Sequence, residues 1–238
     1  MKLVRFSMTL AGATLALAGM APAASATEPS GAQPAIIGGQ YASNAPWAAR
    51  MFVDGRQACS ATIIAPTWIL TARHCAEAGN SYSFRVGSLD QTTGGTVVNG
   101  VDAVINPEGA DLALVQLDQS VQATYSPLGT ENDVNVGQTV QVYGWGATSR
   151  CGSEINCQSR LLKYANVYVD SVNSSDAFGG VAVQATYGDG ITAGGDSGGP
   201  MMGNGRQVGV ASTSDRQSVT NYTNITQYRS WIQEVAGV

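Results

Sequence analysis

The sequence predicts an all-β protein, and three observations support this prediction. Glycine is frequent, with 29 residues in a chain of 238, and many Thr, Val, Asn and Ser residues accompany it. That composition is typical of short strands joined by turns. No helical repeat or long heptad pattern competes with it. Residues 36–238 are enough for a sizeable core, and their number is typical of one two-lobed β protein.

The candidate strands are short and are separated by turn-forming residues. In chain order they are 59–65, 68–71, 83–86, 96–105, 112–117, 139–143, 161–169, 181–185, 207–212 and 221–225. Polar residues and Pro127 interrupt the strand pattern at 121–129, where we expect the boundary between the two lobes. One helix is expected at the C-terminus, because Tyr228, Trp231, Ile232 and Val235 fall at i, i+3, i+4 and i+7.

Residues 1–26 have the pattern of a secretory signal peptide. Lys2 and Arg5 precede an apolar stretch rich in Ala and Leu, and Ala24-Ser25-Ala26 is a small-residue cleavage pattern. The alternative is a membrane anchor, but Thr, Gly and Pro interrupt the apolar segment, which is short for a span. We therefore expect a secreted, extracellular protein with no membrane association after the signal is removed.

The charge of the chain excludes one class of partner. Charged residues make up only 12% of the chain, and the formal net charge is −5. The sequence therefore has no basic footprint for nucleic acid or for an anionic membrane. This excludes those partners without selecting a function.

Ser197 is a candidate nucleophile. It lies in the stretch Gly-Gly-Asp-Ser-Gly-Gly-Pro at 194–200. Glycines on both sides give access to dihedral angles closed to other residues, so the hydroxyl and neighbouring N–H groups can face one reacting atom. The alternative is a plain surface turn, since Gly, Asp and Ser are also ordinary turn formers.

Two further residues favour the catalytic interpretation of Ser197. His74 is the only histidine in the chain and follows an apolar run at 68–70, whereas Asp111 opens an apolar strand. Each alone has a structural interpretation, as a satisfied core histidine or a strand-edge charge. Together the three supply the nucleophile, the base and the acidic group that orients the base.

In the order His74, Asp111, Ser197, each within a local motif of the matching kind, the sequence resembles the chymotrypsin and trypsin family of serine proteases, in a bacterial form. Subtilisins and α/β-hydrolases order the same groups differently. The resemblance covers nearly all of the chain after residue 35. It includes the family's mature N-terminus at Ile36-Ile37-Gly38-Gly39, the pair Cys59 and Cys75, and Gly144-Trp145-Gly146.

The resemblance implies two six-stranded antiparallel β-barrels with a C-terminal helix. It also implies a reaction in which His74 takes the Ser197 proton, while Asp111 holds the imidazole tautomer. The backbone N–H groups of Gly195 and Ser197 would form the oxyanion hole, and Ser212 would support Asp111 and begin the strand that pairs with substrate. The family precedent calls for polypeptide substrates, protein protease inhibitors as partners, a monomer, and no metal or organic cofactor.

Residues 27–35 are a linker by composition and a propeptide by resemblance. In the family, cleavage before the residue matching Ile36 frees an α-ammonium that pairs with the aspartate before the nucleophile, here Asp196. A buried carboxylate is tolerated when it is paired in this way. The cut would follow Ala35, and self-maturation or trimming by another secreted protease would both supply it.

Four cysteines in a secreted chain suggest two disulfides. The resemblance pairs Cys59 with Cys75, which leaves Cys151 and Cys157 for a local bridge. A zinc site is the alternative, but the chain has one histidine and no Cys-x-x-Cys spacing.

The specificity pocket is where the sequence departs most from the family. Ile191 stands where trypsin-like members carry an aspartate at the pocket base, so cleavage after Arg or Lys is disfavoured because the cation would lack a partner. Ser214 and Thr220 stand where deep pockets carry glycines. We therefore expect a shallow pocket that accepts small or aliphatic residues.

Two other functions remain open. One is a catalytically silent binding protein on a protease scaffold, which the altered pocket and the Arg73 before the histidine would allow. The other is an esterase that uses the same three residues. Fold alone does not decide among them.

Overall fold

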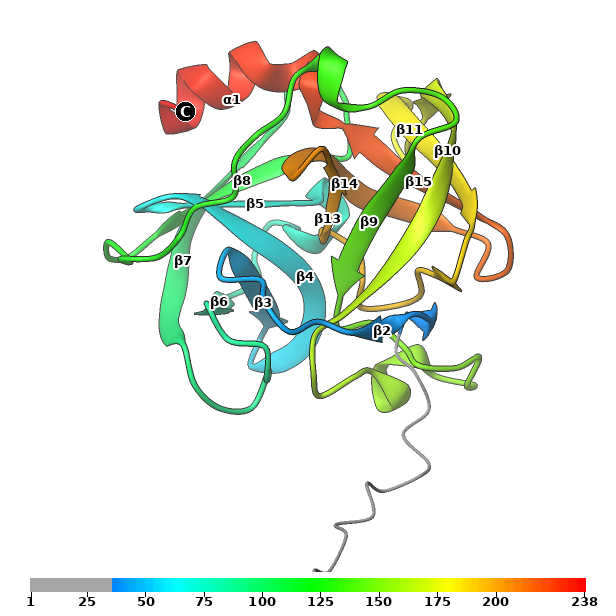
Figure 1. The fold of residues 1–238 in the computed structure, drawn as a ribbon. Coiled ribbons are helices and arrows are strands. Elements are labelled where there is room, and N and C mark those ends of the chain that lie inside the picture. Colours follow the sequence, from blue (N-terminus) through cyan, green and yellow to red (C-terminus); the bar gives the residue numbers. More distant parts are fainter. Residues whose placement is uncertain (1–35) are drawn as a thin grey trace, which may run out of the picture. The chain divides into compact units, whose positions relative to one another are not determined.

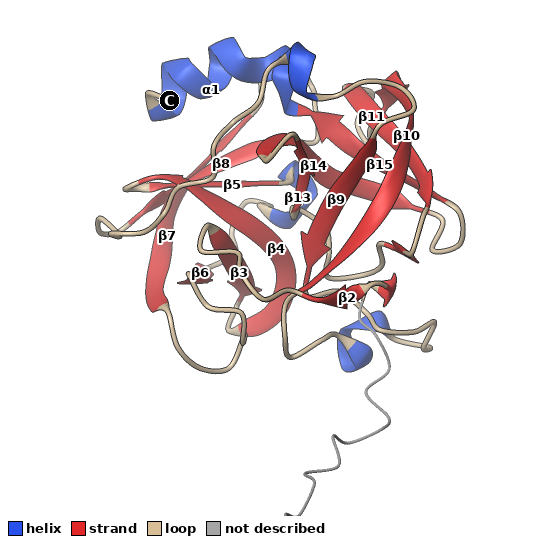
Figure 2. Cartoon of the chain, in the orientation of Figure 1, coloured by secondary structure: helices blue, strands red, loops and turns tan. Residues whose placement is uncertain are grey.

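The computed structural model describes residues 36–238, and the predicted signal peptide at 1–26 and propeptide at 27–35 lie outside them. Strands and turns make up most of the described chain, with one short α-helix at its end (Figure 2). No helix in this part of the chain has the length and apolar character needed to cross a membrane.

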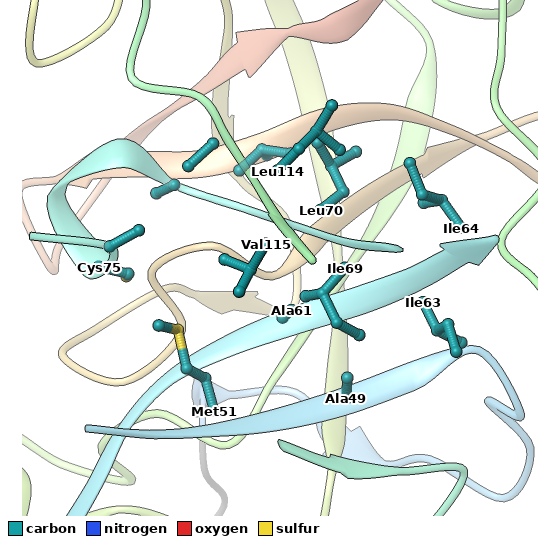
Figure 3. Packing of buried hydrophobic residues seen from close by; sticks show 14 of the residues in the cluster. Ala49, Met51, Ala61, Ile63, Ile64, Ile69, Leu70, Cys75, Leu114 and Val115 are labelled. Atoms are coloured by element: carbon teal, nitrogen blue, oxygen red, sulfur yellow. The ribbon is translucent and has the colours of Figure 1, made fainter. Parts of the chain in front are cut away.

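Six antiparallel strands close into a first barrel in the order β3-β4-β5-β8-β7-β6. They are β3 (Ala48–Val53), β4 (Arg56–Ala65), β5 (Trp68–Thr71), β6 (Tyr82–Val86), β7 (Thr96–Ile105) and β8 (Ala113–Leu117). Alternate residues of a strand point to opposite faces, so Tyr82, Phe84 and Val86 of β6 are buried while the residues between them are only partly so. Figure 3 shows Ile63, Ile69, Leu114 and their neighbours gathered in this barrel's core.

A second set of six strands forms the other barrel (Figure 1). They are β9 (Thr139–Gly144), β10 (Lys163–Ser175), β11 (Val181–Tyr187), β13 (Pro200–Gly203), β14 (Arg206–Ser214) and β15 (Val219–Asn224). The long strand β10 closes this sheet, because its first half pairs with β9 and its second half pairs with β11. Register shifts near Ser171 bend β10 between its two partners.

Two short pairings join the beginning of the described chain to later segments, one to β12 in a separate two-stranded sheet and one to the second barrel. Strand β1 (Ile37–Gly38) pairs with β12 (Gly190–Ile191), and β2 (Gln40–Tyr41) adds to the edge of β10. The connection from β8 to β9 spans 118–138, contains the short 3-10 turn η2 (Glu131–Asp133), and includes the stretch where we expect the lobe boundary. The prediction of two six-stranded antiparallel barrels is confirmed.

The predicted C-terminal helix is also confirmed. The 3-10 turn η4 (Ile225–Tyr228) leads into α1 (Arg229–Ala236). Trp231 and Ile232 are buried in the same cluster as the core of the first barrel. The chain therefore leaves the second barrel and packs its last helix against the first (Figure 1).

Candidate active site

His74 lies in the short 3-10 turn η1 (Arg73–Cys75), which follows β5 directly. The turn is fixed at its end by the Cys59–Cys75 disulfide, with an S–S distance of 2.01 Å, which ties it to β4. The predicted second bridge, Cys151–Cys157, is also present and closes a loop around the 3-10 turn η3 (Glu154–Cys157). Because Cys59 and Cys75 are bonded to each other, they offer no thiolate beside His74 for a zinc ion.

Asp111 meets His74 through both of its carboxylate oxygens. Its Oδ2 lies 2.7 Å from His74 Nδ1, and its Oδ1 accepts a hydrogen bond of 3.0 Å from His74 N. The Ser212 hydroxyl donates to the same Oδ2 at 2.6 Å. The Asp111 side chain is fully buried, whereas 31% of the His74 side chain is exposed. The ring is therefore oriented from the buried side and free on the other.

The surroundings of Asp111 favour its charged form. Burial raises the pKa of this carboxyl. The hydrogen bond and charge of His74 and the hydrogen bond from the Ser212 hydroxyl lower the pKa by more than burial raises it, so the pKa lies below its usual value. An ionised carboxylate beside an imidazole can hold the ring's Nδ1 proton and stabilise the imidazolium.

Ser197 lies in the loop between β12 and β13, and the backbone of this loop is pinned on several sides. Ser60 N donates to Ser197 O at 2.8 Å, and Gly198 N donates to Ala211 O at 2.9 Å. Gly198 has a φ of +78°, and a Cβ there would meet Thr71 Oγ1 at 2.1 Å, so only glycine fits. Ser197 and His74 line the same pocket of about 360 Å³.

No hydrogen bond joins the Ser197 hydroxyl to His74 within residues 36–238. Nucleophile and base are frequently farther apart in a free enzyme than in its substrate complex. The structure thus places His74 and Ser197 on one pocket and bonds the buried Asp111 to His74 from behind.

The backbone before Ser197 leaves two donors open. Neither Gly195 N nor Ser197 N donates to an acceptor in the described part of the chain. The Gly195 carbonyl, in contrast, is held from behind, since it accepts from Ser60 Oγ at 2.9 Å and from the Arg50 guanidinium at 3.2 Å. Gly195 has a φ of +103°, which only glycine adopts without strain.

Arg50 is a site residue that the sequence did not reveal. It is fully buried, and burial lowers the pKa of its guanidinium to about 9, while the charge of Asp196 raises it. Its other donors reach Gln91 Oε1 at 2.9 Å, Cys59 O at 3.3 Å and the Gln158 side chain. No neighbouring residue in the sequence signals this role, because the acceptors come from distant segments.

Asp196 is fully buried and has no ionised partner in hydrogen-bond contact among the described residues. Its carboxylate accepts from Gly146 N at 2.7 Å and from Ala193 N at 2.9 Å. Burial raises the pKa of this carboxyl to about 7, against the lowering effects of these N–H groups and of the charges on Arg50 and Lys163. Ile36 is also fully buried in the second barrel's core, and no hydrogen bond joins it to Asp196 in the described chain.

The residues predicted for the specificity pocket divide into two groups. Ser212 and Ser214 line the pocket together with Thr192, Thr213 and Arg216. Ile191 and Thr220 are each only 1% exposed and do not line it. Ile191 is paired with Ile37 across β12 and β1 and lies away from the pocket surface. The Thr220 hydroxyl is hydrogen-bonded to that of Thr192, with 2.7 Å between the two oxygens. Thr192, which the sequence analysis did not single out, lines the pocket where Ile191 does not.

An ion pair crosses the rim of the pocket. Arg216 donates to Glu154 through Nε at 2.8 Å and through a terminal nitrogen at 3.0 Å. Glu154 also accepts from Gly194 N at 2.9 Å. The loop closed by Cys151–Cys157 is thereby tied to the segment that precedes the candidate nucleophile.

Comparison with protein families gives one match over most of the described chain. The family model described as Trypsin matches residues 36–232. A putative peptidase of Corynebacterium glutamicum is 32% identical over 77% of this chain, and the match covers 66% of that longer protein. Trypsin alpha of Drosophila erecta is 31% identical over 84% of this chain and 87% of its own length. Brachyurin of Leptuca pugilator is 28% identical over 85% of this chain and 99% of its own length.

Solved structures agree with these matches. Mouse neuropsin, a serine protease, superposes with a TM-score of 0.66 at 25% identity over 80% of this chain and 94% of its own. A mutant of human heparin binding protein gives a TM-score of 0.72 at 25% identity over 84% and 96%. A scabies mite inactivated protease paralogue gives 0.74 at 24% identity over 84% and 97%, which supports the fold alone.

Proposed function

The chain belongs to the trypsin family and is a serine-type endopeptidase, and on that premise we propose that it cleaves peptide bonds with Ser197 as nucleophile, His74 as base and Asp111 as the group that orients His74. The observation that carries this proposal is the buried Asp111 carboxylate, which contacts the His74 ring at 2.7 Å on one side of a pocket that also holds Ser197.

The reaction proceeds in two stages. His74 Nε2 takes the hydroxyl proton as Ser197 Oγ attacks the substrate carbonyl carbon, and the imidazolium then gives that proton to the leaving amine as the carbon–nitrogen bond breaks. Water repeats the sequence on the acyl-enzyme and releases the acid. Asp111 stabilises the imidazolium in both stages, which its lowered pKa supports.

The carbonyl oxygen of the substrate becomes negatively charged in each tetrahedral intermediate. The unused N–H groups of Gly195 and Ser197 are the donors proposed to stabilise it. Arg50 and Ser60 hold the Gly195 carbonyl, so that this peptide unit keeps its orientation as charge develops. The loss of one such donor typically costs about 10²–10³ in rate.

Activation by cleavage before Ile36 is part of the same proposal. The buried Asp196 carboxyl, with its pKa raised to about 7, lacks a contacting cation, and the α-ammonium freed at Ile36 would provide one. In that state Asp196 and Ile36 form an ion pair that fixes the loop leading to Ser197.

The proposed preference is for small or aliphatic residues before the cleaved bond. Ser214 and Thr192 place side chains in the pocket wall. Asp196 reaches the same pocket, but it is fully buried and its carboxylate bonds to Gly146 N and Ala193 N. The guanidinium of Arg216 also disfavours a cationic substrate side chain.

The proposal includes secretion, a monomeric state, polypeptide substrates and protein protease inhibitors as partners. The test is the reaction of protein beginning at Ile36 with a fluorophosphonate and with a peptide library, with Ser197→Ala as the control. We expect labelling of Ser197 and cuts after Ala, Val or similar residues. Cuts after Arg or Lys would contradict the pocket assignment, ester turnover without peptide cleavage would indicate an esterase, and absence of labelling would indicate a silent scaffold.

A further inference from the structure

We propose that the turn between β10 and β11, residues 176–180, positions Asp111 for catalysis, with Asp176 as the principal positioning residue. The inference rests on the proposed function of Asp111. Asp111 belongs to the first barrel and the 176–180 turn belongs to the second, so the turn would set the alignment of groups supplied by the two barrels.

Asp176 holds Asp111 through the main chain. Its Oδ2 accepts from Asp111 N at 2.8 Å and from the Thr223 hydroxyl at 2.9 Å. Its Oδ1 accepts from Phe178 N at 2.9 Å and Gly180 N at 2.8 Å, which fixes the carboxylate within its own turn. The carboxylate is thus rigid relative to the second barrel, and Asp111 N is attached to it directly.

Thr223 of β15 holds the same residue from the other end. Its hydroxyl lies 3.2 Å from Asp111 O and shares its proton between that carbonyl and Asp176. Both backbone polar groups of Asp111 are therefore bonded to side chains of the second barrel. The contacts join residues 65 and 112 positions apart in the sequence.

The turn also reaches the other groups around Asp111. Ala177 N donates to Ser212 Oγ at 3.0 Å, which leaves the Ser212 hydroxyl proton directed at Asp111 Oδ2. The Arg73 guanidinium lies 4.3 Å from the centre of the Phe178 ring, a cation–π contact beside His74. The unusual Arg73 before the histidine thus has a structural partner in the turn.

Close packing keeps the turn against the first barrel. A Cβ at Gly180 would lie 2.6 Å from Asp176 Oδ2 and 2.7 Å from Ala110 Cα, so a side chain there would separate the two. Because displacements of about 1 Å at reacting groups cost on the order of 10²-fold in rate, loosening Asp111 should slow catalysis without removing any reacting atom.

The principal test is Asp176→Asn, compared with Asp133→Asn as a matched control. Asp133 is a turn carboxylate that accepts from Thr130 N and the Thr130 hydroxyl and contacts no site residue. We expect Asp176→Asn to lower kcat and the rate of fluorophosphonate labelling of Ser197 by about 10–100-fold, with KM changed less than about threefold. Amide exchange at Asp111 should accelerate in this variant and not in the control.

A second pair of variants keeps the test decisive if Asp176→Asn folds poorly. Thr223→Val removes the hydroxyl while preserving shape, and Thr223→Ser restores it. We expect Thr223→Val to lower kcat and Thr223→Ser to rescue it. Unchanged kcat and unchanged Asp111 exchange in Asp176→Asn, or equal effects of the two Thr223 variants, would overturn the proposal. A wild-type protein that does not label at Ser197 would contradict the proposed function instead, whereas the exchange measurement would still report on the turn.

Discussion

Two fully buried carboxylates, Asp111 and Asp196, lie close to the pocket, and their pKa values are shifted in opposite directions. Asp111 contacts a titratable ring and a hydroxyl, and its pKa is lowered, whereas Asp196 contacts only backbone N–H groups, and its pKa is raised to about 7. Burial raises the pKa of both carboxyls, but the bonds from His74 and Ser212 outweigh it at Asp111, whereas the backbone N–H groups do not outweigh it at Asp196. Within residues 36–238, the Asp111 carboxylate has both an imidazole and a hydroxyl as hydrogen-bond partners, while the Asp196 carboxylate has no cation in contact.

The largest expected effect is on the Asp111 side of this comparison. Asp111→Asn should reduce kcat by about 10⁴, because an amide cannot hold the required imidazole tautomer. Steady-state kinetics on a peptide ester and a peptide amide measures this loss. The control is Asp118→Asn, which alters an exposed carboxylate that accepts from Asn99 and should leave kcat within about twofold. A kcat for Asp111→Asn within tenfold of the wild type would refute the role of Asp111.

The effect of Asp196→Asn on the free energy of unfolding should depend on whether the chain has been cut before Ile36. In a Ser197→Ala background, Asp196→Asn should destabilise the form beginning at Ile36 by about 3–5 kcal/mol, because it leaves a buried ammonium unpaired. In the uncut chain the same change should be neutral or stabilising, since no ammonium is present. Denaturant unfolding of the four proteins gives the answer, and an equal response in cut and uncut chains would exclude the ion pair.

The raised pKa of Asp196 also makes the stability of the uncut chain depend on pH. Asp196 has a pKa of about 7 when folded and 3.8 as its ordinary value, so the folded state retains a proton that the unfolded state releases as the pH rises above 3.8. The contribution of this group to stability is therefore full below pH 3.8 and declines until about pH 7. Thermal unfolding of the Ser197→Ala precursor between pH 4 and pH 8, with and without Asp196→Asn, measures this slope, and the Asn variant should flatten it.

The smallest effect on stability is expected at Glu154, a partly exposed carboxylate. The hydrogen bonds from Arg216 lower the pKa of Glu154, but the Arg216 side chain is 45% exposed and that of Glu154 is 23% exposed. Glu154→Gln should therefore cost only about 0.2–1 kcal/mol of stability. Its effect on KM should exceed its effect on kcat, because Arg216 lines the pocket. A loss of stability as large as that of Asp196→Asn in the cut chain would show that burial does not govern the comparison.

Sequence patterns located most of the strands because their apolar residues recur locally. Strands β5 and β7 have the predicted bounds. Strand β3 was missed because it carries Arg50, whose buried partners are not visible in the sequence. Strand β13 was missed because it begins with Pro200, directly after the glycine-rich stretch around Ser197. Strand β10 runs past its predicted end into polar residues because β11 pairs with them.

The candidate site was predictable to the extent that its residues sit in compact motifs. His74, Asp111 and Ser197 each lie beside a recognisable local pattern. Asp176 and Thr223 do not, because an aspartate in a turn and a threonine in a strand are ordinary residues. Their contacts with Asp111 exist only once the barrels have packed together. The same holds for Thr192, which replaces Ile191 at the pocket surface.

The packing of α1 has a consequence for the order in which the molecule is completed during synthesis. The core cluster of the first barrel includes Ile225, Tyr228, Trp231 and Ile232, although these residues follow the strands of both barrels in the sequence. A nascent chain that has finished β3 to β8 still exposes the apolar surface that these residues will cover. The first barrel therefore reaches its final stability only after residues 225–232 have been synthesised, and a chain cut before Ile225 would keep His74, Asp111 and Ser197 on an unfinished core.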